Sequence, residues 1–144
     1  MTNDVELRLR HIELIQEVIN RHAQNSFIVR GWSVTLVSAV FAVLVTQGGT
    51  ARGLVLLAIA PTLIFWGLDA YFLWKERQFR RLFAAVARRL RDGDAAPDVP
   101  LFEMNTHPYR DHRGRMWRTL YVPAVAAVPV VLIVTVLTYW IARR

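Results

Sequence analysis

Three long apolar runs dominate the hydropathy pattern of this chain. They cover residues 28–46, 53–74 and 119–141. Each is long enough to form a membrane-spanning helix, because about 20 apolar residues cross a hydrocarbon core about 30 Å thick. A soluble domain of 144 residues has too little polar chain to cover three such segments. The pattern therefore predicts an all-α membrane protein with three transmembrane helices.

Two further segments carry apolar stripes at helical spacing, and both continue directly into an apolar run. The first begins at Val5, Leu9 and Ile12, and no Pro or Gly interrupts residues 4–30. We expect one helix of about 40 residues there, about 60 Å long. The second stripe extends the 53–74 run into the basic segment that follows, until Asp92 and Gly93 end the helix. Its members are Phe79, Leu82, Phe83, Val86 and Leu90.

The positive charge is concentrated in one part of the chain. Eleven of the 18 Lys and Arg residues lie between the second and third runs, and only Arg52 lies between the first and second. The positive-inside rule places the N-terminus and residues 75–118 in the cytoplasm, and the C-terminus on the other side. Aromatic residues near the proposed boundaries are typical of an interfacial belt. They are Trp32, Trp74, Trp117, Tyr121, Tyr139 and Trp140.

Four parts follow from this layout. Residues 1–26 form a cytoplasmic amphipathic helix, and residues 27–74 form a transmembrane helical hairpin. Residues 75–118 form a basic cytoplasmic helix and a polar linker. Residues 119–144 contain the third transmembrane helix. We expect the two cytoplasmic helical extensions to pack on each other, because each has one apolar stripe.

Asp69 lies inside the second apolar run, where a carboxylate is costly. It is about 7.5 Å inside Trp74, and Arg30 lies at a similar depth in the first run. We expect these two groups to pair, with Ser33 and Glu76 extending the same polar seam. Such a seam could line an ion path or hold a gate. Alternatively, the pair could fix only how the two helices pack.

The basic segment 75–91 is the second candidate site. Seven of its 17 residues are Lys or Arg. It could bind anionic lipid, a phosphate-bearing ligand or a protein partner, or serve only to set topology. Extended nucleic acid is disfavoured, because the same helix must bury an apolar stripe. The candidate residues are Lys75, Arg77, Arg80, Arg81, Arg88 and Arg89.

Enzymatic chemistry is disfavoured. The chain has no cysteine, no phosphate-cradling glycine loop and no nucleophile elbow. Glu103, His107, Asp111 and His112 lack a metal-ligand spacing, and Pro108 interrupts their helical register. We therefore expect no catalytic residue, cofactor or metal site.

Three stretches resemble a family of small bacterial inner-membrane proteins with three predicted spans. They are NSFIVRGWSVTLVSA at 25–39, FWGLDAYFLWKERQFRRLF at 65–83 and FEMN at 102–105. The family is similar in layout to membrane effectors of anti-phage defence that accompany TIR-like or nucleotide-signalling proteins. The resemblance implies a bacterial inner-membrane location. In that membrane the orientation predicted from the positive charges gives a cytoplasmic N-terminus and a periplasmic C-terminus. It assigns no role to individual residues.

The leading hypothesis is an oligomeric membrane effector that forms a pore or ion channel, or disrupts the membrane, in antiviral defence. A cytoplasmic signal or partner would trigger it, and the chain would assemble as a homo-oligomer because three spans cannot enclose a pore. The alternative is a non-conducting anchor that recruits a cytoplasmic enzyme such as a TIR-domain protein. A proton-coupled transporter is disfavoured, because Asp69 alone lies well inside the spans.

Overall fold

The computed structural model describes residues 2–46, 52–109 and 116–142, without the side chains of residues 2, 44, 45 and 52–58. Every regular element in this part of the chain is a helix. The predicted turn between the first two runs falls mainly on residues 47–51, outside the described residues. In chain order the elements are α1 (Thr2–Thr46), α2 (Arg52–Asp92), η1 (Gly93–Ala95), η2 (His107–Tyr109), α3 (Met116–Leu120) and α4 (Pro123–Ala142).

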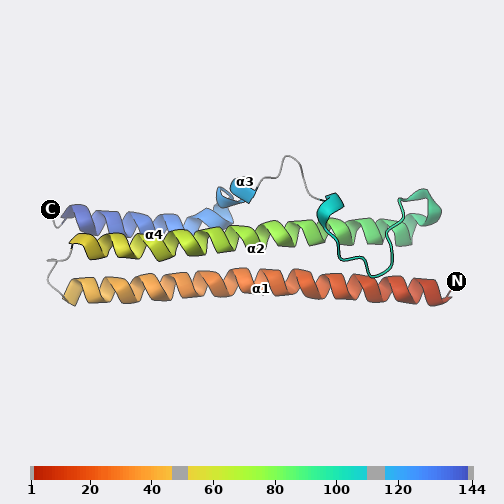
Figure 1. Cartoon of the computed structure of the whole chain (residues 1–144), viewed down its shortest axis with the longest axis horizontal. Helices are drawn as coiled ribbons and strands as arrows, with labels where there is room; N and C mark the ends of the chain where they lie inside the picture. The colour runs from red at the N-terminus through yellow and green to blue at the C-terminus, as the bar shows by residue number, and fades with distance from the viewer. Residues whose placement is uncertain (1, 47–51, 110–115, 143–144) are drawn as a thin grey trace.

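Two long antiparallel helices form the frame of the molecule. α1 has 45 residues and α2 has 41, so each is about 60–70 Å long. Figure 1 shows them side by side along the full length of the molecule. The prediction that each amphipathic segment continues into an apolar run without a break is confirmed. α2 ends at Asp92 as predicted, and Gly93 then takes a φ of 58°, which favours glycine.

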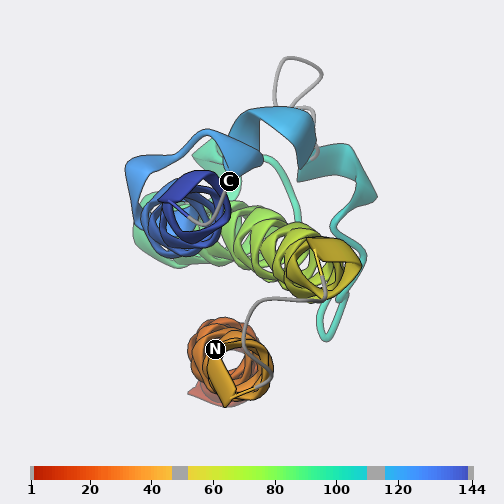
Figure 2. The same ribbon diagram turned by 90° about the vertical axis from the view of Figure 1, so that its left-hand side faces the viewer.

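At the end of the molecule that holds the C-terminus, α4 joins α1 and α2. Figure 2 looks down this end and shows the three helices at the corners of a triangle. Val37 of α1 and Val136 of α4 are buried there and pack against Ile59 of α2. The rings of Phe41 and Tyr139 pack edge to face, with their centroids 4.9 Å apart. This apolar bundle is one of two cores in the fold.

The second core lies at the opposite end, between the first half of α1 and the second half of α2. Ile15, Leu82 and Val86 are fully buried there. The prediction that the two apolar stripes pack on each other is therefore confirmed. Residues 93–109, which we call the strap, return across this end of the hairpin (Figure 1). We predicted residues 92–100 as a polar linker, but Val99 is buried in the second core.

The third predicted span is not one continuous helix. α3 ends at Leu120 and α4 begins at Pro123. Proline disfavours helical geometry in the residue before it and has no N–H to donate, so the helix breaks at residues 121–122. Trp66 of α2 donates its indole N–H to the Leu120 carbonyl oxygen at 3.1 Å, which satisfies a group that the break leaves open.

Within the described residues, two helices, α1 and α4, are long and apolar enough to cross a membrane. Only 17% of the most apolar 18-residue window of each is buried, whereas the core helix of a soluble protein is mostly buried. Phe27, Trp32 and Val131 are each more than 60% exposed. These features indicate membrane association. The middle predicted span, 53–74, includes residues 53–58, whose side chains lie outside the described part of the chain.

Three exposed threonine hydroxyls on the apolar helices are satisfied within the helix. Thr35 donates to the Gly31 carbonyl at 3.0 Å, and Thr135 donates to the Val131 carbonyl at 2.9 Å. Thr138 makes the same bond to Val134 at 2.8 Å. Side chains that bond their own backbone need no water, so exposed threonines on these faces are compatible with a lipid environment.

Candidate functional site

The structure brings Arg30 and Asp69 together between α1 and α2. The Arg30 Nε–H donates to Asp69 Oδ2 at 2.7 Å. Ser26, one helical turn before Arg30, donates its hydroxyl to the other carboxylate oxygen, Oδ1. The Asp69 side chain is 4% exposed and that of Arg30 is 31% exposed. We call Ser26, Arg30 and Asp69 the polar cluster.

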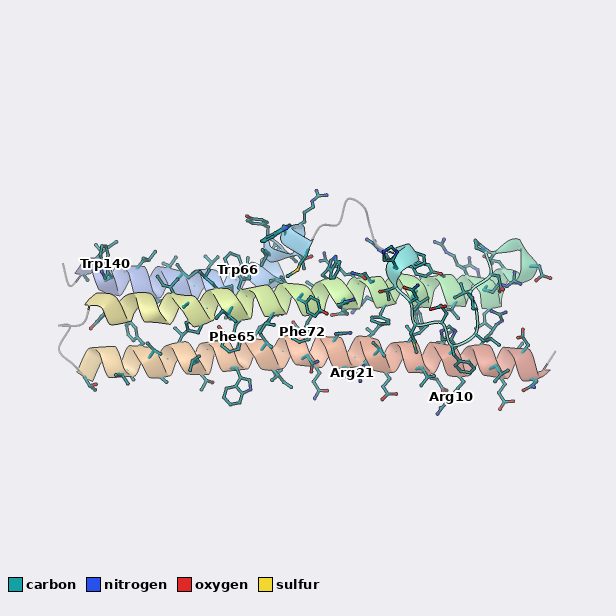
Figure 3. The ribbon with its side chains drawn as sticks, in the orientation of Figure 1. Arg10, Arg21, Phe65, Trp66, Phe72 and Trp140 are labelled. Carbon is teal, nitrogen blue, oxygen red and sulfur yellow. The ribbon has the colours of Figure 1, made fainter. Side chains whose placement is uncertain are left out.

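α4 closes the polar cluster from its other side. A small cavity beside the cluster is lined by Ser33, Trp66, Val125 and Pro129, among others, and has a volume of about 10 Å³. That volume is at the lower limit for one water molecule. Figure 3 shows Trp66 on the α4 side of α2, and Phe65 and Phe72 on the side that faces α1. The site is therefore a small polar pocket inside a three-helix contact.

The depth of the polar cluster can be measured along α4. Val125 and Pro129 line the cavity, and they lie two and six residues after the start of α4 at Pro123. At 1.5 Å per residue, the cluster is about 3–9 Å from that end of the helix. The position within the sequence predicts a similar depth, about 7.5 Å from Trp74. Two independent helices thus place the ion pair one to two turns inside the apolar bundle.

Glu76, the fourth residue of the predicted seam, lies apart from the other three. It is buried, but its carboxylate pairs with Arg80 of the same helix at 2.6 Å. The cavity lining includes Arg30, Ser33 and Asp69 but not Glu76. Glu76 lies two turns further along α2, beyond the residues that line the cavity. Of the four residues in the predicted seam, Arg30, Ser33 and Asp69 therefore lie together at the cavity. Glu76 belongs to a separate ion pair with Arg80.

His22 is a part of the α1–α2 contact that the sequence did not single out. Its ring stacks on Phe79 at 5.7 Å and lies 6.1 Å from the ring of Phe72. The buried Nδ1 atom has no hydrogen-bond partner among the described residues. Burial lowers the pKa of His22, and the neighbouring charges of Arg21 and Lys75 lower it further, while Glu76 acts in the opposite direction. Phe72 and Phe79 lie seven residues apart and so share one face of α2. This spacing is the sequence signal that could have indicated an aromatic contact for His22.

The polar cluster is fully engaged in this state. Both carboxylate oxygens of Asp69 accept hydrogen bonds, and the cavity beside them has room for about one water. The cluster therefore joins α1 and α2 at the level where α4 packs on them, and a change in it would alter that packing.

The predicted basic surface does not form one face. Arg89 binds the strap, Arg81 donates to the Tyr109 carbonyl at 3.2 Å, and Arg80 pairs with Glu76. Lys75 places its ammonium 5.5 Å from the centre of the Trp74 ring. Arg77 and Arg88 are exposed. Most of these charges serve the hairpin and the strap.

The strap is attached to the hairpin by polar contacts as well as by the burial of Val99. His11 of α1 is buried and its Nε2 lies 3.0 Å from the Glu103 carbonyl oxygen. Thr106 donates its hydroxyl to Gln78 Oε1 at 3.0 Å, whereas the buried Gln78 Nε2 has no partner among the described residues. Phe102 has a φ of 61°, which costs about 1–2 kcal/mol for a residue other than glycine. Sequence patterns gave no sign of these contacts.

The residues weighed as a metal site are only partly within the described chain. The Glu103 carboxylate accepts the backbone N–H of Asn105 at 2.8 Å, which forms a local turn. His107 is exposed at the start of η2. Asp111 and His112 lie outside the described residues.

Comparison with known proteins adds no further constraint. Searches against protein-family models, curated proteins and solved structures each found no match for this chain. The resemblance to three-span bacterial membrane proteins therefore stays a hypothesis, and functional inference rests on the geometry above.

Proposed function

We propose that the chain is an oligomeric effector of the bacterial inner membrane that permeabilises the membrane or conducts ions when a cytoplasmic signal or partner triggers it. In this proposal α1, the first part of α2 and α4 are three spans, the N-terminus is cytoplasmic and the C-terminus is periplasmic. The setting we propose is anti-phage defence. One chain cannot enclose a pore, so several copies assemble.

One observation carries the proposal. α1 and α2 run without a break from the hairpin end into the three-helix bundle, and the polar cluster lies where the two regions meet. A twist or separation of the hairpin is transmitted along rigid helices to the Arg30–Asp69 pair. Because packed interfaces switch between discrete arrangements, a small change at one end can repack the other. The exposed apolar faces of α1 and α4 supply surface for lipid and for neighbouring copies.

Membrane potential tests the proposal directly. Cells that express the chain with its trigger should depolarise, as read by a potential-sensitive dye. Arg30→Ala and Asp69→Ala should reduce that depolarisation, whereas Glu13→Gln, which alters an exposed carboxylate, should not. An unchanged membrane potential in triggered cells would rule out conduction and permeabilisation.

A second candidate function is a non-conducting anchor that recruits a cytoplasmic enzyme, such as a TIR-domain protein. It is favoured by the exposed side chains along the hairpin, including Val5 and Leu9, which are 48% and 51% exposed. An anchor should yield a stoichiometric enzyme on co-purification. Its function should survive neutralisation of the Asp69 pair and should be lost when Val5 and Leu9 are changed to Asp.

A further inference from the structure

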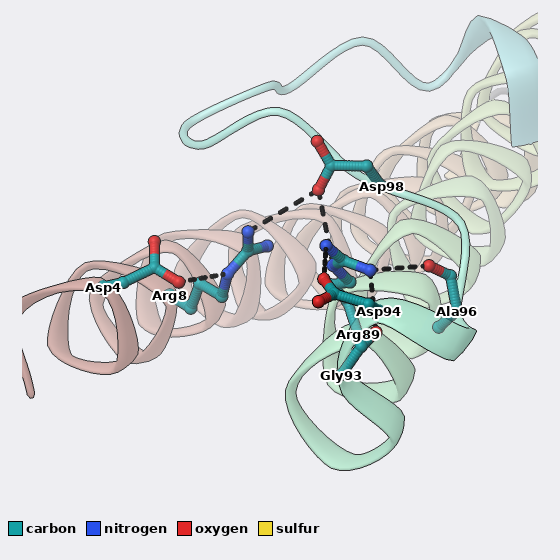
Figure 4. Close-up of polar contacts among 7 residues, drawn as sticks. All are labelled: Asp4, Arg8, Arg89, Gly93, Asp94, Ala96 and Asp98. Atoms are coloured by element: carbon teal, nitrogen blue, oxygen red, sulfur yellow. Dashed lines mark hydrogen bonds and ion pairs between the residues drawn. The ribbon is translucent and has the colours of Figure 1, made fainter. Parts of the chain in front are cut away.

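The strongest site that the proposed function does not use lies at the free end of the hairpin, where two arginines from different helices converge. Arg8 of α1 and Arg89 of α2 have side chains only 14% and 16% exposed. Both guanidinium groups lie 3.5 Å from the same oxygen, Asp98 Oδ1, in the strap (Figure 4). We call Arg8 and Arg89 the arginine fork.

The acidic groups that contact the arginine fork are much more exposed to solvent than the two arginines. The Asp98 side chain is 67% exposed, and Asp94, which pairs with Arg89 at 2.7 Å, is fully exposed. Arg89 also donates to the carbonyl oxygens of Gly93 at 2.7 Å and Ala96 at 2.9 Å. Arg8 also pairs with Asp4 of α1 at 3.3 Å. The arginines are therefore mostly buried and positioned by the helices, while Asp94 and Asp98 sit on an outer segment that solvent reaches.

We propose that the arginine fork is a docking site for an acidic segment of a partner protein, and that the strap occupies it in the resting chain as a tethered substitute. The strap shows the chemistry that fits. Carboxylates at Asp94 and Asp98 reach the fork, and the next residue, Val99, enters the core beside Leu82 and Val86. A competing segment carries two acidic residues followed by an apolar one.

The strap is built so that it can be displaced. Phe102 holds a left-handed backbone conformation, and the buried Gln78 amide nitrogen under the strap lacks a partner. Both features are unfavourable in the docked state, so they lower the barrier to exchange. Release would expose the stripe of the second core. If displacement of the strap is the trigger of the proposed effector, that role rests on the proposed function. The experiment below does not measure conduction.

Hydrogen–deuterium exchange on the full chain in detergent micelles tests the inference. The backbone N–H groups of Ala96, Glu103 and Tyr109 are hydrogen-bonded within the strap, so their exchange reports its release. The probe is a synthetic peptide of residues 92–102, DGDAAPDVPLF, and its control has Asn in place of each Asp. The acidic peptide at millimolar concentration should speed strap exchange, because the tethered segment competes at a similar effective concentration.

Variants define the site. The double change Asp94→Asn with Asp98→Asn should speed strap exchange roughly 2- to 30-fold, because the weak ion pairs that these two exposed carboxylates make with the fork are lost. It should also lower the peptide concentration needed for half-maximal binding. Arg8→Gln with Arg89→Gln should abolish the peptide effect. Glu13→Gln, which removes one negative charge elsewhere on α1, should behave as the natural chain does.

Three results would overturn the inference. The first is strap exchange in the Asp94→Asn, Asp98→Asn variant that is as slow as in the natural chain. The second is equal acceleration by the acidic peptide and its Asn control, which would show that charge is not recognised. The third is equal acceleration by inorganic phosphate, which would make the fork a simple anion site. All three readouts remain measurable if the chain does not conduct ions. A failure of the proposed function can therefore be distinguished from a failure of this inference.

Discussion

Arg30 on α1 and Asp69 on α2 are joined by an ion pair 2.7 Å long, at the level where α4 enters the bundle. The Asp69 carboxylate is almost fully buried, and Ser26 occupies its second oxygen. A buried pair adds little net stability compared with well-packed apolar residues, yet loss of one partner is strongly destabilising. The pair therefore links two long helices at one level, and its removal can be tested one partner at a time.

Removal of the carboxylate alone should destabilise the bundle. Asp69→Ala leaves the Arg30 charge without its partner, and we expect a loss of about 3 kcal/mol in the free energy of unfolding, at the lower end of the range because Arg30 is partly exposed. Thermal unfolding in detergent measures the loss. The double variant Arg30→Leu with Asp69→Leu should recover most of it. A double variant that is stable but does not depolarise cells assigns the pair a functional role, whereas a stable and active one assigns it packing alone.

Acid should weaken the α1–α2 contact through His22. The pKa of His22 is lowered below its ordinary value of 6.5 in the folded chain. The unfolded chain therefore binds more protons just below pH 6.5, and stability falls as the pH drops through that range. His22→Phe should flatten the pH dependence of the melting temperature, measured between pH 8 and pH 5. The exposed His107→Gln serves as the control, and equal slopes in the two variants would contradict this assignment.

The hairpin core should depend on Leu82. Its side chain is fully buried beside Ile15 and Val86, so Leu82→Ala creates a cavity and should cost about 2–5 kcal/mol. Strap amides should then exchange faster, since Val99 packs on the same cluster. Leu9→Ala removes the same atoms from a side chain that is 51% exposed, and we expect a change within about 0.5 kcal/mol. Chemical unfolding followed by circular dichroism measures both variants.

The hydrogen bond from Trp66 to the break between α3 and α4 should contribute to the stability of the fold. Trp66→Phe keeps an aromatic side chain but removes the five-membered ring with the N–H that bonds the Leu120 carbonyl at 3.1 Å. The carbonyl then lacks a partner, and we expect a loss of about 1 kcal/mol in stability. Trp117→Phe, at a side chain 70% exposed, should have little effect on the melting temperature. Equal melting temperatures for the two variants would show that the indole bond is not needed.

Much of the helical framework could be predicted from the sequence. The absence of Pro and Gly from residues 4–30, and the apolar stripe from Phe79 to Leu90, specified two long helices because these signals are local. The Arg30–Asp69 contact was accessible for a similar reason. Two opposite charges at the same depth in adjacent helices have few other partners. Pro123 also carried the signal for the break before α4, but the prediction gave it too little weight.

The contacts of the strap and of His22 were decided only by the tertiary structure. Residues 93–109 contain Pro, Gly and acidic residues that are typical of a solvated linker, and their contacts with Arg8, His11 and Gln78 join positions far apart in the chain. Hydrophobic periodicity shows which residues share the apolar face of one helix and which share its polar face. It does not report which buried group remains without a partner, or which arginine turns inward. Those outcomes depend on how two helix faces and a returning segment fill the same space, and that is a property of the packed chain.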